Sequence, residues 1–436
     1  MKSSAPMKQF NFFEKEGGSD KRKKNDQVVI NPNPNIGFTI NDCVIKEMHT
    51  LDGHVFLSST ISDTKKSDKE ILMLRVYKNS ILGAYDIFNN KIYNFDLTSH
   101  IEEKYLVAIG SDIRGVKDTS KKEDEKKGEI TSIKIFDVHK CLDTNYETEP
   151  KLVKTINLVK TEEKGNIIST ENITSAHLPV KGIECFSISP DFTSMAIGFN
   201  DGNVFVLTAP QNFIASKDIK MSYAKQVCED PITNIGYCIA NKQPHIVFSS
   251  KNQIYKIIIT DKSLPASPVE DAKGANKKCL DVHTSGNKFI FNTPNDTVIS
   301  EYTDFELGRS LSFDGNKKLI LYFKTYLVYS YIDEGDCTHF EIYDPLNKIK
   351  IYVATSINYI IDAVYDNDSI YILESNKGGK KKTITRLKEK DNKEKFDIFY
   401  KKSFFEAAFS YAKTRPRELL YALCACGHQH GILPTD

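Results

Sequence analysis

The amino-acid sequence predicts an all-β fold, a seven-bladed WD-repeat-like β-propeller, on two observations. Most of the chain consists of short runs rich in β-branched and aromatic residues, each bounded by Asn, Asp, Gly, Ser or Pro, and helical periodicity is absent before about residue 395. The runs also recur at intervals of roughly 40 to 50 residues, the length of one four-stranded blade. Two less regular units between residues 37 and 140 complete the count of seven. The five regular units begin near Ile183, Ile232, Lys278, Lys317 and Ile357.

The clearest predicted blade spans residues 176–209. It resembles a WD repeat through His177, the segment FSISPD and the turn Asn200-Asp201-Gly202. An Asp-Gly pair supplies the positive φ angles that a tight hairpin needs. The histidine of such repeats forms a hydrogen bond within its blade, so we interpret His177 as structural and not catalytic.

The chain contains no tryptophan, so the Trp-Asp pair that gives WD repeats their name does not occur. We expect aromatic-Asp pairs to take its place, with the ring packed between blades and the acid beside a turn. Such pairs also arise by chance in a sequence rich in Phe, Tyr and Asp, but the period of the surrounding runs favours the repeat interpretation. The pairs that close strand-like runs are Phe95-Asp96, Phe136-Asp137 and Tyr343-Asp344.

Four charged segments interrupt the pattern, and we predict that they are solvated loops between strands. Their composition cannot bury enough apolar surface to form a core. Basic segments of this kind could also contact anionic lipid head groups, but the acidic residues mixed into three of them weaken that attraction. The segments are residues 17–27, 63–70, 117–129 and 376–395.

The pattern changes at Phe396, which divides the chain into a predicted propeller (residues 1–395) and a predicted helical part (residues 396–436). Ser403 is the expected N-cap of an amphipathic helix, and Glu406 is its capping-box partner. The residues at helical spacing are Phe404, Phe405, Ala408, Phe409 and Ala412.

The opening segment FNFFEKE (residues 10–16) offers a way to close the ring. We predict that it completes a blade with strands from the far end of the propeller, because an unpaired edge strand would expose backbone hydrogen-bonding groups.

Bulk properties exclude several classes of function. With 59 basic and 58 acidic residues the net charge is +1, so no global field recruits nucleic acid or a membrane surface. Nine scattered cysteines, an odd number without framework spacing, indicate reduced thiols. The N-terminal segment contains no apolar run of signal-peptide length, and the longest apolar stretch is interrupted by Lys324. We therefore expect a cytoplasmic protein whose membrane association is peripheral.

Five segments occur in the same order as in one known family. Together they resemble the N-terminal part of the vacuolar protein sorting-associated protein 11 family, over nearly the whole chain to about residue 413. The segments are FNFFEKE (10–16), FSISPDFTSMAIGFNDGNVFVL (186–207), LILYFKTYLVYSY (319–331), EIYDPLNKIKIYVA (341–354) and KEKFDIFYKKSFFEAAFSYAK (393–413).

The resemblance implies a function in membrane tethering. Family members are core subunits of the HOPS and CORVET complexes, which hold endosomal, lysosomal or vacuolar membranes together before SNARE-driven fusion. They carry an N-terminal propeller, a long α-solenoid and a zinc-binding RING domain, so this sequence would supply the propeller and the first helix of a truncated solenoid. The implied partners are the other class C tethering subunits, with small GTPases or SNAREs reached through the complex. The implied location is the cytoplasmic surface of late endosomes, lysosomes or the vacuole.

No enzyme motif is recognisable, and we predict no catalytic, cofactor-binding or metal-binding residue. The segment GGKKKT (378–383) lacks the upstream glycine of a P-loop, whose position holds Glu374, and Lys380 is followed by Lys381 in place of Ser or Thr. Neither a His-Glu-x-x-His nor a Gly-x-Ser-x-Gly pattern occurs. A non-enzymatic interaction platform is the leading hypothesis. The alternative of a propeller-scaffold hydrolase stays open, because a site assembled from several blades leaves no local motif.

The segment CACGHQH near the C-terminal end raises a second alternative, a zinc- or copper-binding protein. Tetrahedral zinc sites take ligands in pairs with a longer loop between the pairs. Here the residues of each pair are separated by one residue, which points neighbouring side chains to opposite faces of an extended segment. We therefore interpret the segment as an exposed end. The four candidate ligands are Cys424, Cys426, His428 and His430.

Overall fold

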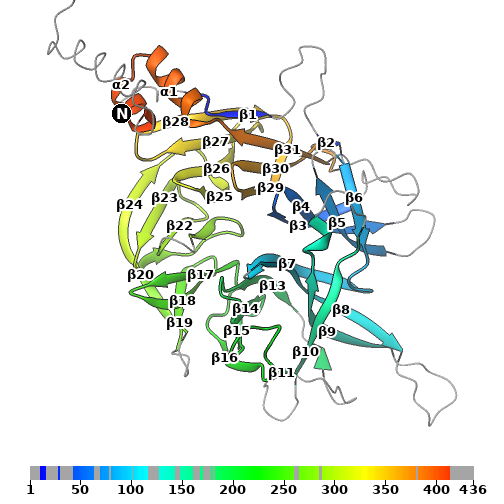
Figure 1. The fold of residues 1–436 in the computed structure, drawn as a ribbon. Coiled ribbons are helices and arrows are strands. Elements are labelled where there is room, and N and C mark those ends of the chain that lie inside the picture. The colour runs from blue at the N-terminus through cyan, green and yellow to red at the C-terminus, as the bar shows by residue number, and fades with distance from the viewer. Residues whose placement is uncertain are drawn as a thin grey trace, which may run out of the picture.

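The computed structural model of the chain describes residues 10–15, 28–29, 43–62, 69–77, 80–100, 102–115, 127–142, 148–160, 167–169, 178–179, 182–259, 265–283, 287–379 and 382–412. Within these ranges the strands form seven antiparallel sheets, which stand around one central axis as the blades of a β-propeller (Figure 1). The strand that begins each four-stranded repeat is the inner one. These seven strands each contact the inner strands of the two neighbouring blades, all the way around the axis. The predicted seven-bladed propeller is therefore confirmed.

The first three blades occupy residues 43–226. The first contains β3 (Cys43–Leu51), β4 (His54–Ser62), β5 (Lys69–Tyr77) and β6 (Ser80–Tyr85). The second contains β7 (Lys91–His100), β8 (Glu103–Gly115), β9 (Lys127–Asp137) and β10 (Lys151–Lys160), with β11 (Ile167–Ser169) and β12 (Leu178–Pro179) paired to β10. The third contains β13 (Ile183–Ile188), β14 (Ser194–Phe199), β15 (Asn203–Thr208) and β16 (Lys220–Gln226).

The other four blades follow to residue 389. The fourth contains β17 (Asn234–Ala240), β18 (Gln243–Ser249), β19 (Gln253–Ile258) and β20 (Ser267–Lys273). The fifth contains β21 (Leu280–His283), β22 (Lys288–Asn292), β23 (Val298–Thr303) and β24 (Glu306–Ser312). The sixth contains β25 (Lys317–Phe323), β26 (Tyr326–Ile332), β27 (Thr338–Asp344) and β28 (Ile349–Ser356). The seventh contains β29 (Tyr359–Asp366), β30 (Ser369–Ser375), β31 (Lys382–Glu389), β1 (Phe13–Lys15) and β2 (Val28–Val29).

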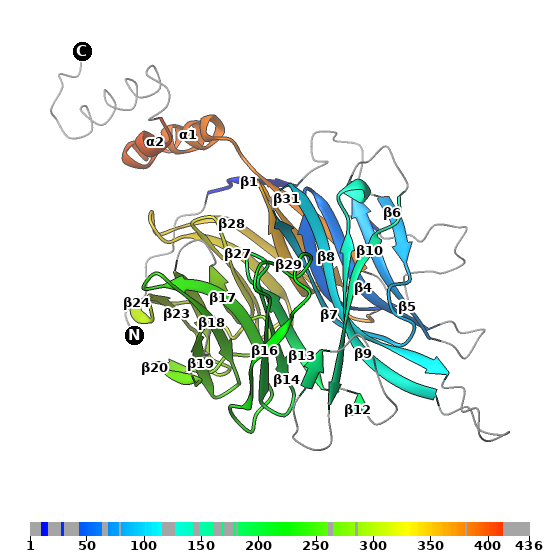
Figure 2. The same ribbon diagram turned by 60° about the horizontal axis from the view of Figure 1, so that its bottom comes forward.

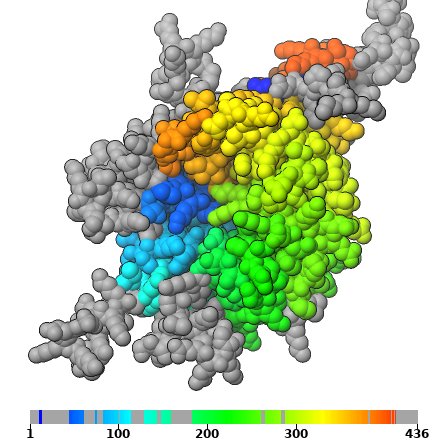
Figure 3. All heavy atoms as spheres, turned by 180° about the vertical axis from the view of Figure 1, so that it is seen from behind, coloured from blue at the N-terminus to red at the C-terminus, as the bar shows by residue number. Residues whose placement is uncertain are grey.

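A strand from the other end of the chain closes the ring. β1 pairs with β31, so that Phe13 lies opposite Glu389 and Lys15 lies opposite Leu387. This pairing covers an edge that would otherwise expose unpaired backbone groups. The predicted union of the FNFFEKE segment with the far end of the propeller is confirmed. Figure 3 shows the blue first blade directly beside the orange last blade.

The blade boundaries follow the predicted period. Each of the five regular blades begins no more than two residues after its predicted start, with inner strands starting at Ile183, Asn234, Leu280, Lys317 and Tyr359. The period is visible in the sequence because each sheet buries its side chains against the sheets beside it, as the cluster shared by the third and fourth blades shows. Complete burial of one Val, Leu, Ile or Phe side chain stabilises the fold by about 1.5 to 3 kcal/mol.

The turn between β14 and β15 contains the predicted glycine. Gly202 has a φ of 76°, and a Cβ atom there would lie 1.9 Å from the carbonyl oxygen of Cys228, so only glycine fits. Asp201 does not share the positive φ that the sequence predicted for the pair. Its carboxylate instead accepts a hydrogen bond from the N–H of Asn203 at 3.2 Å, which stabilises the turn from its side chain.

Two of the three predicted aromatic-Asp pairs end a strand, namely Phe136-Asp137 in β9 and Tyr343-Asp344 in β27. In both, the ring is buried and the carboxylate accepts the N–H of the residue two positions later at 2.9 Å. The prediction is wrong for Phe95-Asp96, which lies inside the inner strand β7. The strand continues through Asp96 as far as His100, so the acid does not mark a turn there.

The last charged segment, residues 376–395, is not a loop as predicted. It contains β31, the third strand of the seventh blade, in which Ile384 and Leu387 are buried. Average composition hid this strand, since its apolar residues alternate with Thr, Lys and Arg. Of the other three segments, residues 17–27 lie outside the described ranges, and the described parts of the remaining two belong to β5 and β9.

Within the ranges that the structure describes, no helix is long and apolar enough to span a membrane.

Candidate interaction site at the propeller exit

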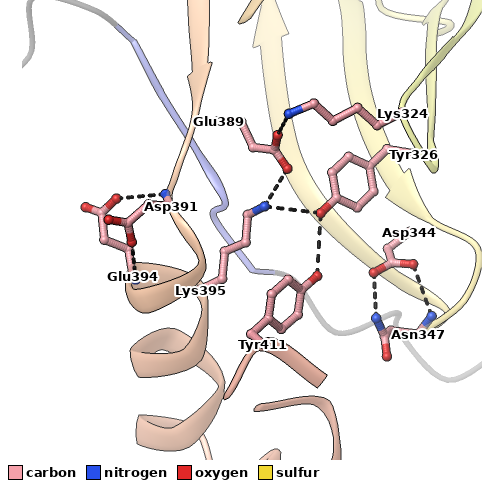
Figure 4. Close-up of polar contacts among 9 residues, drawn as sticks. All are labelled: Lys324, Tyr326, Asp344, Asn347, Glu389, Asp391, Glu394, Lys395 and Tyr411. Carbon is pink, nitrogen blue, oxygen red and sulfur yellow. Dashed lines mark hydrogen bonds and ion pairs between the residues drawn. The ribbon is translucent and has the colours of Figure 1, made fainter. Parts of the chain in front are cut away.

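Two short helices leave the propeller directly after β31, where one helix was predicted. They are α1 (Asn392–Lys401) and α2 (Phe405–Ala412), and Figure 2 shows them projecting from one side of the molecule beside β1 and β31. The carboxylate of Asp391 accepts the N–H of Glu394 at 2.8 Å, and the Glu394 side chain accepts the N–H of Asp391 at 3.1 Å (Figure 4). This capping box fixes the start of α1 and contributes about 1 kcal/mol.

Ser403 ends the first helix, so the prediction that it caps the second is wrong. Its φ is 61°, in the left-handed region, whereas an N-cap is extended. Its N–H donates to the carbonyl of Tyr400, and the N–H of Phe404 donates to the carbonyl of Phe399 at 2.9 Å. These two bonds form a Schellman motif, completed by the contact between the Phe399 and Phe404 rings. α2 then begins after Phe404, whose carbonyl accepts the N–H of Ala408.

The N-terminal strap, which we define as residues 10–15, lies between the propeller and both helices. Its backbone continues across the sixth blade, where the N–H of Phe10 donates to Lys350 at 2.8 Å and that of Phe12 donates to Ile351 at 2.9 Å. The Phe10 and Phe12 rings each lie about 5 Å from the ring of Phe399, at 4.9 and 5.0 Å. The strap therefore joins three elements that are far apart in the sequence.

The helix residues predicted from their spacing contribute to this contact as far as they are described. Phe404 packs against Phe10 with ring centroids 5.0 Å apart, and Ala408 is completely buried. Phe405 contacts Tyr400. The side chains of Phe409 and Ala412 lie outside the described residues.

A buried polar network, which we call the exit joint, fixes the first helix to the propeller (Figure 4). Lys395 of α1 forms an ion pair with Glu389 at the end of β31, and both side chains are more than nine-tenths buried. Glu389 also pairs with Lys324, in the turn after β25, at 2.5 Å. The Lys395 ammonium donates to the Tyr326 hydroxyl at 3.4 Å, which lies 3.5 Å from the hydroxyl of Tyr411 in α2.

The surroundings of the exit joint keep its tyrosines neutral. Burial raises the pKa of Tyr326 well above its usual value, and the neighbouring Tyr411 and Glu389 raise it further. Burial likewise raises the pKa of Tyr411. Both tyrosines therefore stay as neutral hydroxyls that form hydrogen bonds. The ammonium group of Lys395 also lies 5.8 Å from the centre of the Phe12 ring, within the range of a cation–π interaction. The arrangement therefore positions the helices against the propeller.

The two strands that close the propeller, β1 and β31, lie at the two ends of a match to a known family. The family model described as PEP5/VPS11 N-terminal matches residues 8–389, from just before the strap to the last residue of β31. The chain belongs to the PEP5/VPS11 family. The family resemblance identified in the sequence is thereby confirmed.

Curated relatives and a solved structure agree with the family match. The Mus musculus and Homo sapiens proteins named vacuolar protein sorting-associated protein 11 homolog are each 25% identical to this chain over 248 residues. The matched region is 53% of this chain and 25% of each relative, so the chain spans a quarter of their length. The crystal structure of Chaetomium thermophilum Raptor has a TM-score of 0.52 at 9% identity, and covers 88% of this chain and 29% of that one. It supports the fold alone.

Several residues singled out in the sequence of this PEP5/VPS11 family member lie outside the described ranges. They are His177 and the candidate metal ligands Cys424, Cys426, His428 and His430. Among the residues that the structure does describe, no group of three or more His, Cys, Asp or Glu side chains is arranged to hold a metal ion.

The exit joint could not be found by sequence motifs. Lys324, Glu389 and Lys395 belong to two different blades and a helix, and no spacing relates them. The Asp391-to-Glu394 capping box, in contrast, was readable as Asp-Asn-Lys-Glu, but it fell in a segment interpreted as a charged loop.

Proposed function

We propose that this chain is the propeller part of a non-enzymatic subunit of an endolysosomal or vacuolar tethering complex of the HOPS or CORVET type. It would act in vesicle-mediated protein transport and membrane fusion, without catalytic residues or a cofactor. The observation that carries the proposal is the family match over residues 8–389, whose ends are the two strands that close the ring. The names of the mouse and human relatives support the link to vacuolar protein sorting.

We further propose a division of labour along the chain. Residues 1–395 would form the interaction platform, and residues 396–436 would begin an α-solenoid whose direction is fixed by the exit joint. A rigid joint suits a tether, because a partner bound to the blades is then held at a defined angle to the helices. The proposed partners are the other class C tethering subunits, with small GTPases or SNAREs reached through the complex. The chain would then sit in the cytoplasm, peripherally on late endosomal, lysosomal or vacuolar membranes.

Affinity purification tests this function. The tagged chain, expressed in cells that contain the class C tethering subunits, should recover those subunits in an analysis of bound proteins by mass spectrometry. A matched chain that ends at Lys390 keeps every blade strand and shows which contacts depend on the helices. Recovery of no endolysosomal subunit by the complete chain would contradict the proposal.

A further inference from the structure

One end of the propeller axis carries a cluster of charged residues that come from several blades. β31 runs in the same direction as the inner strand β29, because each of them is antiparallel to β30. α1 follows the end of β31, so the inner strands begin at the opposite end of the propeller axis. We define the channel mouth by six residues in or just before the first halves of inner strands. They are Lys46, Glu47, Lys91, Lys277, Lys278 and Asp362.

Ion pairs cross the channel and form the floor of the mouth. Lys277 lies 2.9 Å from one carboxylate oxygen of Glu47, and Lys278 lies 3.7 Å from the other. Lys278 also forms an ion pair with Asp362. The lysines precede the fifth blade, whereas Glu47 and Asp362 belong to the first and seventh, so these contacts join blades that are not neighbours in the ring. Both carboxylates are more than nine-tenths buried, and the floor of the mouth is therefore occupied by matched charges.

Above this floor lie Lys46 and Lys91, with Glu184 as a neighbouring acid. Lys46 is half-buried, and within the described part of the chain no hydrogen bond or ion pair satisfies its ammonium group. Burial lowers the pKa of Lys46, and repulsion from Lys91 and Lys277 lowers it further, against the opposing charges of Glu47 and Glu184. Lys91 rests on the ring of Tyr93 at 4.6 Å. The mouth thus presents cations that an incoming anion would stabilise.

The same backbone irregularity, a β-bulge, occurs near the start of several inner strands at this mouth. The inner strands of five blades each contain a register shift in their first half, which inserts one extra residue opposite the neighbouring strand. Such β-bulges redirect a side chain and are frequent beside binding sites. The residues inserted are Lys46, Tyr93, Glu184, Lys318 and Ile361.

We propose that the channel mouth binds an acidic peptide segment, whose carboxylates pair with Lys46 and Lys91. A narrow ligand fits better than a membrane surface, because the outer turns of the same face carry exposed carboxylates at Asp201 and Glu334. Those carboxylates would repel an anionic bilayer laid flat on the face. The inference rests on the charges of the mouth and holds whichever complex the chain joins.

Fluorescence anisotropy with a labelled hexaglutamate peptide tests the proposal on the complete chain. The double variant Lys46→Gln/Lys91→Gln should weaken binding by about tenfold, and added salt should weaken binding to the unmodified chain. The matched control is Lys242→Gln/Lys348→Gln, which removes the same charge from two exposed turns at the opposite ends of the blades. This control should change the affinity by less than about twofold. Circular dichroism checks that each variant is folded.

Three outcomes would overturn the proposal. One is an equal loss of affinity in the mouth variant and the control, and another is equal binding of a hexaglutamine peptide. The third is sedimentation with vesicles of phosphatidylcholine and about 20 mol % phosphatidylserine in the absence of peptide binding, which would assign the face to a membrane. If the double variant does not fold, the single variant Lys91→Gln replaces it, because Lys91 is exposed, with an expected loss of about two- to threefold.

Discussion

The exit joint and the channel mouth both pair lysines with carboxylates, but in opposite surroundings. At the exit joint, Lys395 and Glu389 are enclosed by aromatic rings, and every charge has a partner. At the channel mouth, Lys277 is half exposed and Lys46 is repelled by other lysines. Enclosed pairs fix geometry because separating them leaves a buried charge, whereas solvated and unmatched charges stay available to a ligand. The comparison thus separates a positioning site from a binding site.

The largest effect is expected from removing the strap. A chain without residues 1–16 loses the fourth strand of the seventh blade and three buried rings, those of Phe10, Phe12 and Phe13. Each buried phenylalanine is worth about 3 to 5 kcal/mol, so the deletion should abolish folding or lower the melting temperature by more than about 10 °C. Thermal unfolding measures this. A chain without residues 1–9 keeps the described strap and serves as the control, and an unchanged melting temperature of the longer deletion would show that the strap does not close the ring.

Lys395→Met should destabilise the exit joint by about 3 to 5 kcal/mol, because among the described residues it leaves the buried Glu389 with the half-exposed Lys324 as its remaining cation. Urea unfolding measures the change. Lys393→Met removes the same charge from an exposed position of the same helix and should cost less than about 0.5 kcal/mol. Equal effects of the two substitutions would mean that the joint does not depend on the buried pair.

The stability of the propeller should also depend on pH through His54, which lies in the first blade and contacts Leu142 of the second. Burial, and the charge of Arg75, lower the pKa of this histidine to about 4, while its Nε2 contacts the carbonyl of Leu142 at 3.0 Å. Between pH 4 and 6.5 the unfolded chain binds a proton that the folded chain does not, so stability is complete above pH 6.5 and falls as the pH is lowered. The loss amounts to at most about 3 kcal/mol.

Unfolding of the unmodified chain and of His54→Gln at several pH values tests this slope. The variant should have a flatter dependence between pH 6.5 and 4, whereas His139→Gln, at an exposed histidine, should behave like the unmodified chain. Parallel curves for all three proteins would rule out His54 as the source of acid sensitivity.

The smallest effect is expected at the channel mouth. Lys277→Met should cost about 1 to 2 kcal/mol, because Lys277 is half exposed and Glu47 keeps Lys278 at 3.7 Å. The stability difference from the unmodified chain should shrink in high salt, in contrast to that of Lys395→Met. Chemical unfolding at low and high ionic strength makes the comparison, with Lys273→Met as the exposed control. Identical salt dependence of the two main variants would remove the distinction between the regions.

Local sequence predicted the parts of the fold that depend on local packing. The blade starts could be predicted because every blade repeats the same pattern of buried apolar residues. The Asn200-Asp201-Gly202 turn could be predicted because its glycine must take a positive φ. β31 was missed because its charged residues lie beside buried Ile384 and Leu387, and composition averages over both. A strand covered on both sides can hold Lys or Arg residues, because their aliphatic carbons pack against neighbouring side chains while their charged groups reach solvent or an acidic partner.

Two equivalent helix-start signals show where local reasoning ends. Asp391 to Glu394 and Ser403 to Glu406 both have the spacing of a capping box, yet Ser403 closes the first helix in a left-handed conformation. The choice follows from the packing of Phe404 against Phe10 and Phe399, and Phe10 lies almost four hundred residues away in the chain.

The sequence alone determined the seven-bladed propeller, the family to which the chain belongs and the pairing of its opening segment with the last blade. These properties repeat along the chain or are carried by contiguous segments, so each copy adds to the signal. Only the tertiary structure decided the exit joint and the channel mouth. Their charges come from blades that meet after the ring has closed, and an ion pair depends on the distance between two atoms in space, which no spacing in the sequence specifies.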